Sequence, residues 1–123
     1  MFKMEVKTTQ NPPTHSALFG YTLHWRMSAK HERIDDPTLY YCFVHIARDT
    51  HRFRFFVVPS AVVATHVRDQ HALWLRSPAS RTGAQTHKDS DIREFHLGLN
   101  EQCDDPLATP LASQYEDQWE FSD

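Results

Sequence analysis

The stretch Met4-Glu5-Val6-Lys7-Thr8-Thr9 decides the fold, because polar and apolar residues alternate through it. Alternation with a period of two is typical of a β-strand with one apolar face. Residues two apart lie on the same face of a strand, so Glu5 and Lys7 are expected to project from one side. Asn11-Pro12-Pro13 ends the predicted strand, since proline has no N–H to donate to a ladder.

A carboxylate and an ammonium two residues apart can act together on a phosphodiester. Glu5 can hold a divalent cation with help from the backbone carbonyl of Val6. Lys7 can then orient or deprotonate the attacking water and stabilise charge on the phosphate. The same spacing is common on solvent-facing strands, where it has no function, so the pattern needs support from the rest of the chain.

The following residues predict a mixture of strands and helices. Ser28 is a suitable N-cap for a short helix over 29–34. Residues 39–46 are apolar and aromatic almost throughout, which predicts a central strand covered on both sides. Residues 52–58 predict its antiparallel partner.

The longest predicted helix runs from residue 61 to 76, with Ser60 as its cap. Its apolar stripe contains Val63, Val67, His71 and Trp74, which places Gln70 on the outer side. His71 is expected to be a core histidine bonded to a backbone carbonyl. Further predictions are a surface loop over 78–88, a short strand or turn over 91–97, and a segment over 115–121 that docks onto the body.

The order of these elements resembles the PD-(D/E)XK, or restriction-endonuclease-like, nuclease superfamily, in particular its small bacterial members. The resemblance covers nearly the whole chain. It is carried by Glu5-Val6-Lys7-Thr8, Trp25-Arg26-Met27-Ser28-Ala29-Lys30-His31-Glu32, Tyr40-Tyr41-Cys42-Phe43-Val44, Phe55-Phe56-Val57-Val58-Pro59-Ser60 and His71-Ala72-Leu73-Trp74-Leu75.

The resemblance implies an α/β fold with a restriction-endonuclease-like mixed sheet flanked by helices. It makes Glu5 and Lys7 the catalytic pair, and Glu5 and Val6 the ligands of Mg²⁺ or Mn²⁺; it also places His31 near Glu5. In the superfamily, a helix and a strand with a metal-binding Asp precede the Glu-x-Lys strand. This sequence starts at that strand, so we expect an N-terminally truncated core. Its second carboxylate would come from a second subunit or from Asp35-Asp36.

Two functions follow as expectations. The first is a metal-dependent DNA endonuclease-like domain whose activity is impaired or lost in the isolated chain. The alternative is a non-catalytic domain that binds nucleic acid or a protein, so whether the chain is an enzyme stays open. A phosphate-facing surface would use the basic residues Lys30, Arg33, Arg52 and Arg54.

Length and charge place the chain as one domain. Its 123 residues suit a single domain with a compact body over 1–97 and an acidic segment over 98–123. Residues 1–93 carry 13 basic and 8 acidic side chains, a balance of +5, whereas residues 94–123 carry 8 acidic and no Lys or Arg. A basic body with an acidic tail is found in proteins that meet polyanions and in freely soluble proteins.

Partners and location complete the expectations. A core that lacks its front part leaves an edge and a face uncovered, which predicts a homodimer. No apolar run is long enough for a signal peptide or a membrane helix, so a cytoplasmic protein without membrane contact is expected. Cys42 lies in an apolar run and Cys103 in an acidic one, which does not suggest a disulfide framework.

Overall fold

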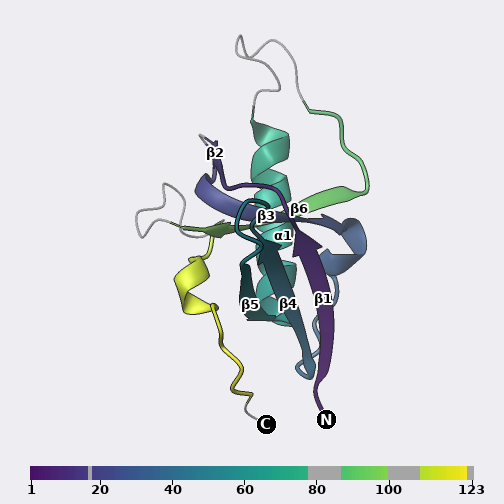
Figure 1. Cartoon of the computed structure of the whole chain (residues 1–123). Helices are drawn as coiled ribbons and strands as arrows, with labels where there is room; N and C mark the ends of the chain where they lie inside the picture. Colours follow the sequence, from purple (N-terminus) through teal and green to yellow (C-terminus); the bar gives the residue numbers. More distant parts are fainter. Residues whose placement is uncertain (17, 78–86, 100–108, 122–123) are drawn as a thin grey trace.

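The structure is a computed structural model, and it describes residues 1–16, 18–77, 87–99 and 109–121. Six strands, one α-helix and two short 3-10 helices follow one another through these residues in a mixed α/β arrangement (Figure 1). The strands form two sheets, with the orders β1-β4-β5 and β2-β3-β6. The elements are β1 (Lys3–Thr9), β2 (Thr14–Ser16), β3 (Gly20–Ser28), η1 (Ala29–Glu32), β4 (Leu39–Ile46), β5 (Phe53–Pro59), α1 (Ser60–Arg76), β6 (Ile92–Gly98) and η2 (Ala112–Gln114).

Strand β4 is the middle strand of its sheet, as its nearly continuous apolar sequence predicts. It pairs in parallel with β1 and antiparallel with β5. Residues 41–45 of β4 are all buried, so side chains on both faces of the strand are covered. The predicted central strand and its antiparallel partner are therefore confirmed.

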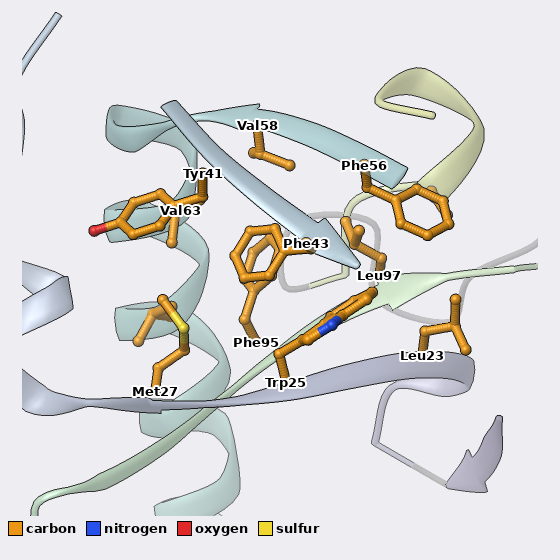
Figure 2. Packing of buried hydrophobic residues seen from close by; sticks show 12 residues of the cluster. Leu23, Trp25, Met27, Tyr41, Phe43, Phe56, Val58, Val63, Phe95 and Leu97 are labelled. Carbon is orange, nitrogen blue, oxygen red and sulfur yellow. The ribbon is translucent and has the colours of Figure 1, made fainter. Parts of the chain in front are cut away.

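The hydrophobic core takes side chains from both sheets and from α1 (Figure 2). Phe43 of β4 lies between Trp25 of β3 and Phe95 of β6, with ring centroids 5.1 and 4.7 Å apart. The indole Nε1 of Trp25 also donates a hydrogen bond to the carbonyl oxygen of Val44, at 2.9 Å. The buried side chain of Trp25 thus connects the two sheets, through packing against Phe43 and through a hydrogen bond to β4.

Helix α1 packs on β6 through a polar residue that the sequence pattern assigns to the wrong face. Gln70 is buried rather than exposed, and its side-chain amide completes the backbone pairing of β6. Gln70 Nε2 donates to the carbonyl oxygen of His96 at 3.1 Å, and the N–H of His96 donates to Gln70 Oε1 at 2.9 Å. The amide acts here as a peptide group would, satisfying buried backbone atoms of β6.

The start of α1 also differs from expectation. The N-cap position is Pro59, without a capping side chain, rather than Ser60. The hydroxyl of Ser60 donates instead to the carbonyl oxygen of Asp36 at 2.7 Å and accepts the N–H of Asp36 at 3.1 Å. Ser60 therefore fastens the loop before β4 to the beginning of α1.

Residues 115–121 lie along β5 and across the outer face of its sheet. The N–H of Val57 donates to the carbonyl oxygen of Tyr115, and the guanidinium of Arg54 forms a two-pronged ion pair with Glu116 at 2.8 and 2.9 Å. The ring of Phe121 packs on Tyr40, with centroids 4.7 Å apart. These contacts attach residues 115–121 to the body, as the sequence predicts.

The remaining predictions have mixed outcomes. The short strand or turn expected over 91–97 is a strand, β6, which runs over Ile92–Gly98. Most of the predicted loop over 78–88, and Cys103, lie outside the described residues. Cys42 is buried, and burial raises the pKa of its thiol. Among the described residues, no helix combines the length and apolar character needed to cross a bilayer.

Candidate functional site

Two charged side chains of strand β1, those of Glu5 and Lys7, lie on the face that points into the molecule. Met4 and Val6 are 41 % and 58 % exposed. Glu5 and Lys7 face the other way, and their neighbours across the ladder are the buried Tyr41 and Phe43 of β4. An ordinary surface strand would place its apolar residues inward, because each one buried there contributes about 1.5–3 kcal/mol.

The two charged groups form an ion pair at this inner face. Lys7 Nζ lies 3.1 Å from Glu5 Oε1, and their side chains are 25 % and 40 % exposed. An ion pair with that exposure contributes about 1 kcal/mol or less to stability. Glu5 is thus about as exposed as Met4, at 41 %, so the ion pair lies at the rim of the inner face, where part of each side chain reaches water.

The backbone of β1 offers further polar groups at an open edge. The N–H of Lys3 donates to the carbonyl oxygen of Thr38 at 2.8 Å. In a parallel sheet, every second residue of a strand forms its backbone hydrogen bonds to the same neighbouring strand. The backbone groups of Lys3, Glu5 and Lys7 therefore bond to β4. The N–H and C=O of Val6 point away from β4. No described strand pairs with that edge of β1. The Val6 carbonyl is therefore placed beside Glu5 and is not used by the sheet.

The short helix η1 brings a histidine to the same place. His31 Nε2 lies 3.9 Å from Glu5 Oε1, with only 3 % of the His31 side chain exposed. The N–H of Ser28 donates to His31 Nδ1 at 2.9 Å. A backbone N–H can only donate, so in this contact Nδ1 accepts and the ring proton sits on Nε2; the other tautomer would donate from Nδ1 to the carbonyl oxygen of Ser28, 3.1 Å away. Burial lowers the pKa of His31; a hydrogen bond to the backbone of Ser28 opposes this effect, and the positive charge of Lys7 adds to it.

Tyr41 supplies a fourth polar group. Its ring meets that of His31 edge to face, with centroids 5.9 Å apart. Figure 2 shows its hydroxyl at the outer end of the ring, pointing away from the other labelled core side chains. Burial, followed by the negative charge of Glu5, raises the pKa of Tyr41 to about 12, so the hydroxyl keeps its proton. Sequence reasoning missed Tyr41, because an aromatic residue in an apolar strand looks like simple core packing.

Two buried groups at this place, His31 Nε2 and the hydroxyl of Tyr41, have no hydrogen-bond partner among the described residues. The site thus combines one carboxylate, one ammonium and two unused donors, and we refer to Glu5, Lys7, His31 and Tyr41 as the β1 site. One oxygen ligand from Glu5 and one from Val6 suit a hard cation such as Mg²⁺ or Mn²⁺. No group of three His, Cys, Asp or Glu side chains suited to a metal occurs in the described ranges.

Asp36, expected as one source of a second carboxylate, is used elsewhere. Its carboxylate accepts hydrogen bonds from the hydroxyl and N–H of Thr38 at 2.7 and 2.9 Å and pairs with Lys3 at 3.1 Å. The Thr38 hydrogen bonds, with help from Lys3, lower the pKa of Asp36 to about 2. Asp36 therefore stabilises the turn before β4 rather than the β1 site.

The four predicted phosphate-binding side chains divide into two groups. Lys30 is the exposed neighbour of His31 on η1, and the exposed Arg33 follows η1 directly. Arg52 is also exposed but precedes β5, two strands away from β1. The guanidinium of Arg54 is occupied by Glu116. Of the four, Lys30 and Arg33 are the two that lie on or next to η1, the element that carries His31.

A cavity of about 280 Å³ lies between α1 and β6, away from the β1 site. At the wall of this cavity, His71 Nε2 lies 2.9 Å from Asp89 Oδ1. The prediction that His71 bonds to a backbone carbonyl is therefore wrong. His96 stacks on Phe19 at 4.2 Å and lies 3.4 Å from Glu94. The lining comes from segments far apart in sequence, and no local motif signals it.

Comparison of the chain with protein-family models, curated proteins and solved structures finds no significant match. The function therefore has to be inferred from the residues of the chain itself.

Proposed function

We propose that the chain is a restriction-endonuclease-like domain that binds a DNA phosphodiester at the β1 site. In this proposal the Glu5 carboxylate and the Val6 carbonyl hold Mg²⁺ or Mn²⁺, and Lys7 contacts the phosphate or the attacking water. The main support is the inward orientation of the Glu5 and Lys7 side chains, while Met4 and Val6 are exposed. Glu5 and Lys7 lie beside the buried Tyr41 and Phe43 and keep access to water, as a site for a ligand from solution requires.

The chemistry of the site fits phosphodiester hydrolysis. A cation bound at Glu5 would polarise a phosphoryl oxygen and favour ionisation of a bound water. Lys7, 3.1 Å from Glu5, is close enough to stabilise negative charge that develops on the same phosphate. The exposed Lys30 and Arg33 beside His31 would contact neighbouring phosphates along the DNA backbone.

The open edge of β1 suggests a homodimer. Strands β1 of two copies can pair antiparallel about a twofold axis at Val6, with each Val6 N–H and C=O bonded to the other copy. In that register Glu5 stands opposite Lys7 of the partner subunit, and Lys7 opposite Glu5 of the partner subunit. Opposite charges directly across an antiparallel pair stabilise it, so the strand is complementary to itself.

This register would also bring in a second carboxylate. Side chains on a diagonal of an antiparallel pair are about 7–8 Å apart at their Cα atoms, within reach of two glutamates. Glu5 of the partner subunit would therefore lie near the cation held by Glu5 and Val6. A dimer with this geometry would supply the oxygen ligand that one copy lacks.

A second candidate function is non-catalytic binding of nucleic acid. It is favoured by the small number of oxygen ligands, since within the described residues no set of three metal-ligating side chains meets at one point. In that case Lys7 and its basic neighbours would hold phosphates without a metal. Both candidates predict DNA binding, and they differ in whether a metal and hydrolysis accompany it.

Cleavage of supercoiled plasmid with Mg²⁺ or Mn²⁺ tests the proposal. We expect the wild-type chain to nick the plasmid, and Glu5→Gln and Lys7→Met to reduce the rate by about 10²-fold or more, as loss of a transition-state contact does. Lys3→Met is the matched control, because Lys3 is on the same strand but pairs with Asp36. This control should cleave at the wild-type rate.

DNA retardation on a gel, measured in parallel, separates the two candidates. Binding that depends on Lys7, without cleavage by the wild type under any metal, would exclude the hydrolase and support the binding domain. Equal cleavage by the wild type and Glu5→Gln would contradict the catalytic assignment.

A further inference from the structure

We propose that His31 and Tyr41 form a pair of hydrogen-bond donors that holds a non-bridging oxygen of a phosphate group next to Lys7. This inference rests on the proposed function, and it extends that function from the charged pair on β1 to two buried neutral groups. The ligand is defined by its chemistry as a tetrahedral phosphate oxyanion, either a DNA phosphodiester or free phosphate.

We assign the donor role of His31 from the shorter of two contacts at Nδ1, which lies 2.9 Å from the N–H of Ser28 and 3.1 Å from the carbonyl oxygen of Ser28. When Nδ1 accepts that N–H, the ring proton is on Nε2, which lies 3.9 Å from Glu5 Oε1. This separation exceeds the length of a hydrogen bond, so the donor does not reach the carboxylate directly. An Nε2 that carries a proton also cannot bind a metal, which limits His31 to donating.

The second donor lies on a different element but faces the same place. The hydroxyl of Tyr41 is buried, and like His31 Nε2 it has no partner in the described ranges of the chain. Buried polar groups without partners are rare, because each one loses its bonds to water. His24 Nδ1 and Thr109 Oγ1 are similar atoms elsewhere in the described residues. The groups on η1 and β4 differ in that they are neighbours, with rings 5.9 Å apart, beside Glu5 and Lys7; in the proposal one acceptor from outside the chain satisfies both.

The charges around the two donors favour an anion over a cation. Nε2–H, O–H and the Lys7 ammonium together present three donors, against the single carboxylate of Glu5. Phosphate is suited to this set, since each non-bridging oxygen accepts several hydrogen bonds and a charge-assisted bond from lysine. Glu5 would repel the anion unless a cation neutralises it, so phosphate and Mg²⁺ should each strengthen binding of the other.

The test measures binding rather than cleavage, so that its failure differs from failure of the nuclease. Orthophosphate and a short DNA duplex are titrated separately, with Mg²⁺ present, into the wild type, Tyr41→Phe and His31→Gln. A hydrogen bond to a charged group corresponds to about 10- to 100-fold in affinity, and we expect each variant to weaken binding by that factor. Tyr40→Phe is the matched control, because Tyr40 packs on Phe121 at the opposite face of β4.

The two ligands also identify the source of the phosphate. Weaker binding of the duplex assigns the pair to DNA phosphodiesters, and weaker binding of orthophosphate alone assigns it to free phosphate; either result supports the proposal. Tyr41→Phe removes one buried atom and should fold without loss of stability, so it keeps the test meaningful if His31→Gln does not fold. Unchanged affinity for both ligands in Tyr41→Phe, or no binding by the wild type, would overturn the proposal.

Discussion

Glu5→Lys and Lys7→Glu are expected to be monomers separately and to form a heterodimer when mixed. In the β1–β1 pairing proposed above, Glu5→Lys places lysine opposite Lys7 of the partner subunit, and Lys7→Glu places glutamate opposite Glu5 of the partner subunit. Like charges directly opposite each other destabilise a strand pair. The mixture restores opposite charges at both positions, so it should form the dimer that is proposed for the wild type.

Light scattering measures the dimer, and native mass spectrometry identifies the heterodimer when one variant is labelled with ¹⁵N, because Glu and Lys have nearly equal masses. Val6→Pro gives an independent check because it removes the N–H that points to the open edge but none that bonds to β4. It should be a monomer, whereas Val6→Thr should remain a dimer. A monomeric wild type at high concentration, or dimers of either charge variant alone, would contradict this register.

Trp25→Ala is expected to cost about 3–5 kcal/mol of the free energy of unfolding, the range for truncating a large buried aromatic side chain. The indole fills the core between the two sheets and bonds to the carbonyl oxygen of Val44 at 2.9 Å. Its removal leaves a cavity and takes away that hydrogen bond. A loss of this size is a large part of the total stability of a small domain.

Urea unfolding followed by circular dichroism provides the measurement, and Trp119→Ala is the matched control. Trp119 is 45 % exposed and contacts Phe55 at the surface, so its loss should cost about 1 kcal/mol or less. Similar effects of both substitutions would show that Trp25 does not hold the sheets together as the structure implies.

Periodic and strongly apolar segments were predictable from the sequence. Residues 39–46 form β4, and the stripe containing Val63 and Val67 forms the buried side of α1. In both segments one local pattern determines the structure, because burial of apolar side chains dominates the energy. The short helix after Ser28 was also expected and is present as η1.

Polar residues inside the fold were not predictable from such patterns. Gln70 is buried because its amide bonds to the backbone of β6, a contact 26 residues away in sequence. His71 bonds to Asp89, 18 residues away, for a similar reason. A helical pattern records only hydrophobicity, so it places such residues outside even where tertiary hydrogen bonds bring them inside.

The β1 site was predictable in part. Spacing placed Glu5 and Lys7 on one face, but it did not determine that this face points inward, because alternation alone is the same in both orientations. The resemblance placed His31 nearby. Neither gave the proton position on His31, which depends on the N–H of Ser28, nor the hydroxyl of Tyr41, which depends on the register of β1 and β4.

The binding of a divalent cation at Glu5 is the central claim, and titration with Mn²⁺, followed by electron paramagnetic resonance, tests it most directly. The wild type should bind Mn²⁺, and Glu5→Gln should lose that binding while it keeps the fold. Glu116→Gln removes a carboxylate that pairs with Arg54 instead, so it should bind as the wild type does. Equal Mn²⁺ binding by the wild type and Glu5→Gln would contradict a metal site at Glu5.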